Sequence, residues 1–237
     1  MLMDPLIGHR GVAGLAPENT LAGIRKAAEL GFQWVELDVT LLGDGQPVIF
    51  HDRRVNRTSN SVGLIKSYGL NEARALDVGS WFSTEFAQER IPTLREALLL
   101  IKELQLGLNL ELKVNSNSPR QLARVVSEVL NEVALPEDKL VVSSFNIKAL
   151  RYFHSLHSAH IGCLFHRLPK HWQSIASGLQ ATSIHLGLGN LCERQVKSVK
   201  RHGYEVYCYT VNQLYDLKLV QSWGADGLFS DAIYPVE

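Results

Sequence analysis

Short apolar runs alternate with amphipathic segments along nearly the whole chain. Eight of the runs read as strands: "PLIGH", "WVELDV", "LGLNLEL", "KLVVSS", "HIGCLF", "TSIHLG", "EVYCYTV" and "DGLFSD". Between most of them, apolar residues recur at three- and four-residue spacing, which is typical of helices. Strands that alternate with helices form parallel βα units. The pattern predicts an α/β fold, first a closed (β/α)8 TIM barrel and alternatively an open doubly wound sheet.

One segment breaks this alternation. Only "TLLGDGQP" separates "WVELDV" from "VIFHD", which is too little chain for the crossover helix of a parallel pair. Its Asp-Gly is a turn signal, so we expect "VIFHD" to fold back against the second strand. Residues of about 43–90 are then predicted to form a small insertion subdomain above the barrel mouth, within a single domain of residues 1–237.

Composition limits the class of protein. A chain of 237 residues with 46% hydrophobic content can bury a large core. Its 24 basic and 24 acidic side chains cancel, and no lysine-arginine stripe indicates nucleic-acid binding. No apolar run approaches the ~20 residues of a membrane helix, and no signal peptide is recognisable at the start. We therefore expect a cytoplasmic protein without a membrane span.

The three cysteines are widely spaced and form no CxxC motif. This spacing favours buried thiols at Cys163, Cys192 and Cys208 over disulfides or a zinc site. The aromatic residues of "SWF" and "YCYTV" are likewise expected in the core rather than in a pocket.

Acidic side chains follow the alternation of two predicted strands. Glu36 and Asp38 share one face of "WVELDV", whose apolar face should meet the helices. The same parity places Asn109, Glu111 and Lys113 on the inner face of "LNLELK". Buried carboxylates must have raised pKa values, pair with cations or bind a metal. Oxygen ligands alone favour a hard divalent cation, Mg²⁺ or Ca²⁺, over zinc.

Two histidines follow predicted strands. His9 comes after "LIG" and His51 after "VIF", and the carboxyl ends of barrel strands are where barrel enzymes place catalytic groups. A single histidine there is more often structural. Two histidines beside a metal site suit phosphate ester cleavage, which needs a base for the attacking oxygen and an acid for the leaving alcohol. We expect His9 and His51 to form this acid-base pair.

Basic side chains accompany the predicted metal site. The Arg10 guanidinium can contact two phosphate oxygens, and Gly11 lets the backbone approach a ligand closely. Lys113 supplies a second cation, or alternatively forms a simple ion pair with Glu111 or Asp38.

Other polar residues have plainer interpretations. Asn19 or Thr20 of "PENT" can cap the first helix. Arg53, Arg54 and Arg57 are expected in a solvated loop rather than as a headgroup clamp. No role is assigned to the remaining histidines, which show no metal-like pairing: His154, His157, His160, His166, His171, His185 and His202.

Ten short motifs occur in a characteristic order over essentially the whole chain: "HRG", "PENT", "ELDV", "DG", "HD", "IPTLREAL", "LELK", "SSF", "YTVN" and "DGLFSD". As an ordered set they resemble the glycerophosphodiester phosphodiesterase family, in particular its compact bacterial cytosolic members. The resemblance implies a (β/α)8 barrel with a small insertion. It also implies hydrolysis of glycerophosphodiesters, such as glycerophosphocholine or glycerophosphoethanolamine, to glycerol 3-phosphate and an alcohol.

The resemblance also implies residue roles at matching positions. These are metal ligation by Glu36, Asp38 and Glu111, acid-base work by His9 and His51, phosphate contacts from Arg10 and Lys113, and substrate contacts from Phe145, Tyr209 and Asn212. Two departures stand out. Tyr209 occupies a position where many members have tryptophan, and the terminal "D-x-P" becomes "DAIYP" from Asp231, which we expect to affect a strand end rather than the chemistry.

Two alternative functions fit parts of the same pattern. A lysophospholipase D of the same barrel type would need a membrane-facing surface, and no basic amphipathic helix provides one. A non-catalytic barrel that binds glycerophosphodiesters would be expected to have lost a histidine or a carboxylate, and none is missing. The sequence leaves open the alcohol group, the cation, the role of each histidine, the attacking oxygen (from water or the glycerol 2-hydroxyl), and whether the chain forms a homo-oligomer.

Overall fold

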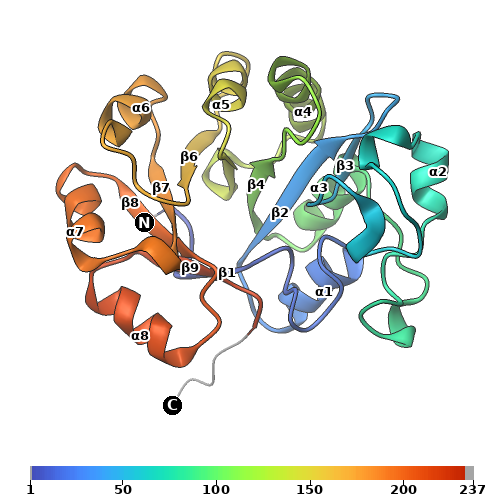
Figure 1. Cartoon of the computed structure of the whole chain (residues 1–237), viewed down its shortest axis with the longest axis horizontal. Helices are drawn as coiled ribbons and strands as arrows, with labels where there is room; N and C mark the ends of the chain where they lie inside the picture. Colours follow the sequence, from blue (N-terminus) through green and yellow to red (C-terminus); the bar gives the residue numbers. More distant parts are fainter. Residues whose placement is uncertain (1, 233–237) are drawn as a thin grey trace.

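The computed structural model describes residues 2–232, and its strands lie inside a ring of helices (Figure 1). The strands are β1 (Leu6–Gly8), β2 (Trp34–Leu41), β3 (Pro47–Ile49), β4 (Gly107–Leu112), β5 (Leu140–Ser144), β6 (His160–Phe165), β7 (Ser183–Gly187), β8 (Glu205–Tyr209) and β9 (Gly227–Ser230). The α-helices are α1 (Leu21–Glu29), α2 (Leu70–Ala75), α3 (Leu94–Glu103), α4 (Pro119–Val133), α5 (Ile147–His154), α6 (Trp172–Gly178), α7 (Glu193–Arg201) and α8 (Leu214–Ser222). Short 3-10 helices are η1 (Val55–Arg57), η2 (Ile65–Ser67), η3 (Thr84–Phe86), η4 (Glu137–Lys139) and η5 (Leu188–Asn190).

The sheet closes into a barrel. Its strand order is β1-β9-β8-β7-β6-β5-β4-β2-β3, and an additional parallel pairing of β1 with β2 completes the ring. The closed barrel confirms the first choice of fold and rules out the open sheet. Strand β3 pairs antiparallel with β2, with Val39 opposite Ile49, so the predicted fold-back is also confirmed.

The helices begin where the sequence supplies caps. Thr20 caps α1, because its side-chain oxygen accepts a hydrogen bond from the backbone N–H of Gly23. Thr93 and Glu96 form a capping box at the start of α3. Ser118 caps α4, and Pro119 takes its first position.

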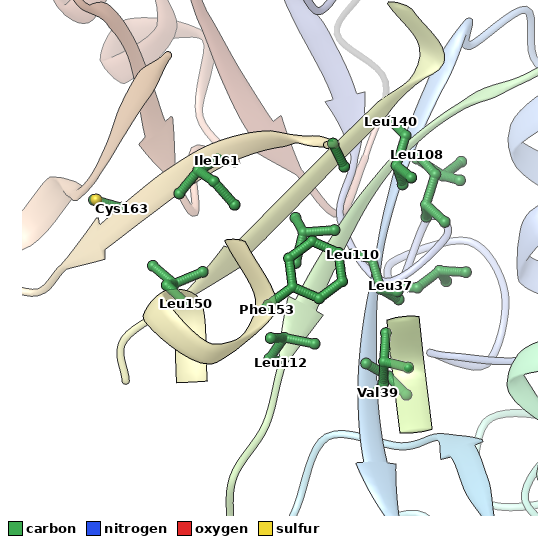
Figure 2. Close-up of a cluster of buried hydrophobic side chains, with 14 of the residues drawn as sticks. Leu37, Val39, Leu108, Leu110, Leu112, Leu140, Leu150, Phe153, Ile161 and Cys163 are labelled. Carbon is green, nitrogen blue, oxygen red and sulfur yellow. The ribbon is translucent and has the colours of Figure 1, made fainter. Parts of the chain in front are cut away.

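The two faces of the strands divide as their alternation predicts. Leu37 and Val39 of β2, together with Leu108, Leu110 and Leu112 of β4, belong to the main core. Figure 2 shows these side chains in one cluster with Leu150 and Phe153 of α5. A separate cluster contains Met3, Ile7, Trp34, Val141, Tyr207 and Phe229. Trp34 shares the parity of Glu36 and Asp38, so this second cluster marks the barrel interior below the acidic residues.

The segment between β3 and α3 carries η1, η2, α2 and η3 and lies to one side of the barrel, around α2 in Figure 1. Its own apolar cluster consists of Leu42, Val48, Phe50, Val55, Ile65, Ala73, Leu76, Val78 and Ile91. We propose that this cluster defines the insertion subdomain of about residues 43–90. Trp81 stays outside it with 41% of its surface exposed, so the expectation of a core position is wrong for this residue.

The cysteines are all free thiols. Cys163 and Cys208 are buried as expected, whereas Cys192 is exposed at the start of α7. Among residues 2–232, no helix combines the length and the apolar character that crossing a bilayer requires.

Candidate active site

Three carboxylates meet at the barrel mouth because β2 and β4 are neighbours in register. Asp38 lies opposite Glu111, and Glu36 lies opposite Asn109. Glu36, Asp38 and Glu111 can each offer one oxygen atom such that these atoms lie within 4.8 Å of one another. All three side chains are buried. The structure thus brings together the acidic residues that the strand parity selected.

The electrostatics of this cluster favour a cation. Burial, together with the charges of Asp38 and Glu111, raises the pKa of Glu36 well above its usual value. Burial also raises the pKa of Glu111 to about 7, although Lys113 opposes the change. The pKa of Asp38 is lowered, because Lys113 and Arg10 outweigh the effect of burial. Two cationic side chains therefore face three carboxylates, and a divalent metal ion fits this all-oxygen site.

The two cations lie against the acidic cluster. Lys113 Nζ is 2.7 Å from Glu111 Oε1 and 3.3 Å from Asp38 Oδ1, so the ion pairs considered for this lysine are both present. Arg10 Nε is 3.4 Å from Asp38 Oδ2, and its NH1 group donates to Glu18 Oε1 at 2.8 Å. Both cations border the pocket that contains Glu36.

The backbone at Arg10 and Gly11 turns sharply. Their φ angles are 52° and 87°, in the left-handed region. This turn lets the Arg10 N–H donate to Glu36 Oε2 at 2.9 Å and the Gly11 N–H donate to the Glu36 carbonyl at 3.0 Å. A Cβ atom on Gly11 would lie 2.9 Å from the carbonyl carbon of Gly23. The close approach that Gly11 permits here is therefore to helix α1.

Asn19 serves the acidic cluster rather than the helix. Since Thr20 caps α1, the Asn19 side chain is available to contact Asp38. Asn19 Nδ2 donates to Asp38 Oδ2 at 2.8 Å. The sequence offered helix capping as its only interpretation, because a contact to the next strand leaves no local pattern.

Each predicted catalytic histidine is paired with an aspartate. His9 Nδ1 lies 2.6 Å from Asp231 Oδ1, and His51 Nδ1 lies 2.6 Å from Asp52 Oδ1. Neither Nε2 atom has a hydrogen bond within the described part of the chain, although that of His9 is 3.9 Å from Glu36 Oε2. Asp231 was expected only to mark the end of a strand, whereas in the structure it also contacts His9. The "HD" dipeptide was a usable signal for Asp52, whereas Asp231 follows a distant strand.

A pocket of about 370 Å³ opens above the acidic cluster. One side is lined by polar and charged residues: His9, Arg10, Glu36, His51, Asn109, Glu111 and Lys113. The remaining wall is largely aromatic or apolar and consists of Phe145, Leu164, His166, Tyr209, Thr210 and Phe229. The pocket thus has a charged side and an apolar side, which suits a small molecule with a phosphate and a short organic arm.

The pocket wall contains a stacked pair of rings and two polar atoms that are unpaired within the described residues. The His166 ring stacks on Phe145 with centroids 4.1 Å apart and planes at 22°, yet the sequence assigned this histidine no role. Asn109 Oδ1 and the Tyr209 hydroxyl are buried in the pocket lining and lack a hydrogen-bond partner among residues 2–232. Both atoms can therefore bond a polar ligand.

Asn212, expected near the substrate, lies beside the pocket rather than in its lining. Its Nδ2 donates to Asp231 Oδ2 at 2.7 Å, and its Oδ1 accepts from the Asp231 N–H at 2.9 Å. Its direct contacts thus fix the aspartate that pairs with His9.

Comparison with known proteins agrees with this geometry. Residues 9–234 match the Glycerophosphoryl diester phosphodiesterase family. The glycerophosphodiester phosphodiesterase of Caldanaerobacter subterraneus subsp. tengcongensis is 34% identical over 229 residues, which are 95% of this chain and 93% of the relative. A glycerophosphodiester phosphodiesterase of Bacillus altitudinis is 30% identical over 236 residues, which are 97% of this chain and 95% of the relative.

A solved structure extends the agreement to three dimensions. The Oleispira antarctica phosphodiesterase, solved in complex with the product sn-glycerol-3-phosphate, superposes with a TM-score of 0.92 at 38% identity and covers 97% of this chain and 93% of that one. With the family match, the relatives and the pocket in agreement, the chain belongs to the glycerophosphoryl diester phosphodiesterase family of hydrolases.

Proposed function

We propose that this protein hydrolyses glycerophosphodiesters such as glycerophosphocholine and glycerophosphoethanolamine to sn-glycerol 3-phosphate and an alcohol. The observation that carries the proposal is the meeting of three buried carboxylates and two histidines at one pocket. The product complex of the Oleispira antarctica relative supports a glycerol phosphate ligand. The carboxylates were expected from the parity of β2 and β4, and the histidines from their positions after two predicted strands.

We assign Glu36, Asp38 and Glu111 as the ligands of the cation, Mg²⁺ or Ca²⁺. When bound, such an ion stabilises negative charge on the phosphate oxygens. Arg10 and Lys113 add positive charge at the same place and orient the phosphate through hydrogen bonds. Their present contacts with Asp38 hold both groups beside the carboxylates.

The histidines handle protons in this proposal. Asp231 and Asp52 accept hydrogen bonds from the Nδ1 atoms of His9 and His51, which leaves each Nε2 for the reaction. One Nε2 takes the proton of the attacking oxygen as the bond from that oxygen to phosphorus forms. The other gives a proton to the leaving alcohol as its bond to phosphorus breaks. The attacking oxygen belongs either to water or to the glycerol 2-hydroxyl, and the second route gives a cyclic phosphate first.

The apolar side of the pocket is proposed to hold the glycerol arm. Phe145 and Tyr209 form aromatic walls, and the free Tyr209 hydroxyl can bond a glycerol hydroxyl. Asn212 contributes through Asp231, which it fixes in place.

Release of glycerol 3-phosphate tests the proposal. The purified protein is assayed with glycerophosphocholine and glycerophosphoethanolamine in EDTA, and again after Mg²⁺ or Ca²⁺ is restored. We expect release that requires the cation and collapses in His51→Ala but not in His171→Ala, because His171 is exposed and its side chain makes no cap bond. No release by folded, cation-loaded protein would contradict the proposal, and release from lysophosphatidylcholine alone would favour the lysophospholipase D alternative.

We also propose a cytoplasmic location and leave homo-oligomerisation as a second question. Fractionation of the source cells tests the first, and light scattering of the purified protein measures the oligomeric state.

A further inference from the structure

Arg57 lies outside the pocket described above and holds two carboxylates at once. Its Nε donates to Asp52 Oδ2 at 2.8 Å. Its NH1 and NH2 groups donate to the two oxygens of Glu18 at 2.6 Å and 2.8 Å. The arginine was expected in a solvated loop, and its side chain is indeed 46% exposed. Its contacts nevertheless use all three nitrogen atoms of the guanidinium group.

Each of these carboxylates holds a proposed active-site group with its other contacts. Asp52 Oδ1 lies 2.6 Å from His51 Nδ1. Glu18 Oε1 accepts a hydrogen bond from Arg10 NH1 at 2.8 Å. Arg57 is therefore one carboxylate away from the proposed acid-base residue and one carboxylate away from the proposed phosphate contact.

The connection joins two distant parts of the chain. Arg10 and Glu18 belong to the loop between β1 and α1, whereas His51, Asp52 and Arg57 follow β3. The Arg57 backbone is part of η1, which is anchored by the fully buried Val55 of the apolar cluster between β3 and α3. A packed segment thus positions the guanidinium, which limits the freedom of both carboxylates.

The charges make the arrangement sensitive to loss of Arg57. Glu18 is 8% exposed; burial would raise its pKa, but the hydrogen bond from Arg57 and the charge of Arg10 lower it instead. The pKa of Asp52 is lowered first by its hydrogen bond to His51 and then by Arg57. Without Arg57, a mostly buried Glu18 keeps one cationic partner, and Asp52 loses the group that fixes its second oxygen.

We propose that Arg57 is a positioning residue for the phosphodiesterase reaction, which orients His51 through Asp52 and Arg10 through Glu18. This inference rests on the proposed function of His51 and Arg10. Arg57 itself touches no reacting atom in this scheme.

Kinetics of Arg57→Ala test the inference, with Arg53→Ala as the matched control. Arg53 is exposed, and its side chain makes no hydrogen bond or ion pair with residues 2–232. At saturating cation, we expect kcat/KM of Arg57→Ala on glycerophosphocholine to fall about 10- to 100-fold, which corresponds to the loss of a charged hydrogen bond. Arg53→Ala should stay within about twofold of the wild type, as for a surface substitution.

Rescue separates positioning from a general structural role. Because the Arg57 side chain is partly exposed, guanidinium ion at non-denaturing concentration should restore part of the activity of Arg57→Ala. Sodium chloride at equal ionic strength should not. Arg57→Lys should remain impaired, since one ammonium group cannot reproduce the fork to two carboxylates.

Separate variants test the connection to His51 through Asp52 and the connection to Arg10 through Glu18. Asp52→Asn should lower mainly kcat through His51, and Glu18→Gln should raise mainly KM through Arg10. The double variant of Arg57→Ala and Asp52→Asn should have a kcat close to that of Asp52→Asn alone, because both changes release the same histidine.

An NMR measurement tests, without relying on activity, whether Arg57 orients His51. The Nδ1 proton of His51, assigned by its disappearance in His51→Ala, should shift or broaden in Arg57→Ala and stay unchanged in Arg53→Ala. An unchanged resonance, or a loss of activity without guanidinium rescue, would overturn the positioning role. If the wild type released no glycerol 3-phosphate, the proposed function would fail, and the NMR comparison would still decide whether Arg57 orients His51.

Discussion

Asn19 and Asp38 hold each other through two hydrogen bonds. The Asn19 side-chain nitrogen donates to Asp38 Oδ2 at 2.8 Å, and the Asp38 backbone N–H donates to Asn19 Oδ1 at 3.0 Å. Both residues are buried, and Asn19 has a φ of 56°, a conformation that asparagine tolerates better than most residues. Asn19 thus orients one carboxylate of the acidic cluster from the neighbouring loop.

The first prediction concerns this contact. Asn19→Ala should weaken cation binding and lower the free energy of unfolding by about 1–3 kcal/mol, because it leaves buried polar atoms of Asp38 unpaired. The adjacent Thr20→Ala removes the cap of α1 and the hydrogen bond from the Thr20 hydroxyl to the Pro17 carbonyl. It should also lower stability, by about 1–3 kcal/mol, but leave cation affinity unchanged, because Thr20 does not contact the carboxylates. Calorimetric titration with Mg²⁺ or Ca²⁺ and urea unfolding measure both quantities. Equal cation affinity in the wild type and Asn19→Ala would show that the contact does not organise the site.

The second prediction compares two glycines with similar backbone angles. Gly11 has a φ of 87° and Gly31 a φ of 85°, but a Cβ would clash with the Gly23 backbone only at Gly11, because nothing lies within 4 Å at Gly31. Gly31→Ala should lower stability by about 1–2 kcal/mol for the left-handed conformation alone. Gly11→Ala should lower it further and reduce kcat, because the displaced turn carries Arg10. Urea unfolding and steady-state kinetics test the pair, and similar losses in both variants would contradict the steric explanation.

Much of the fold and of the acidic cluster could be predicted because their signals are local. The alternation of strands and helices favoured the barrel over an open doubly wound sheet, and the two-residue period of β2 and β4 selected Glu36, Asp38 and Glu111. Since these strands are neighbours in register, parity was sufficient to predict that the carboxylates meet.

The rest of the site depends on contacts between loops that are distant in sequence. Asp231 reaches His9 across 222 positions, and Arg57 reaches Glu18 across 39. His166 follows β6, and no periodic pattern marks it as a pocket residue. Such contacts follow from barrel closure and from the packing of the segment after β3, which a single sequence does not specify.

The third prediction concerns the stacked wall of the pocket. His166 lies against Phe145, and Lys113 Nζ is 5.7 Å from the centroid of the same Phe145 ring. His166→Ala should raise KM for glycerophosphocholine about 2- to 10-fold, the equivalent of an aromatic stack, with kcat little changed. Steady-state kinetics measure the split, with the exposed His171→Ala as control. A large fall in kcat at constant KM would instead assign His166 to the chemical step.

The fourth prediction concerns His185 inside the barrel. This residue is fully buried, its Nε2 lies 2.8 Å from Ser183 Oγ, and burial lowers its pKa from 6.5 to about 3. Below pH 6.5 the unfolded chain binds a proton at this position that the folded chain does not, so the contribution of His185 to stability is full above pH 6.5 and falls as the pH drops toward 3. At pH 5 the loss should be about 2 kcal/mol relative to neutral pH. Urea unfolding at both pH values measures this loss in the free energy of unfolding. The loss should be about 2 kcal/mol smaller in His185→Gln than in the wild type, and in His171→Gln it should equal that of the wild type. Parallel losses in the wild type and His185→Gln would mean that the buried imidazole does not cause the acid sensitivity.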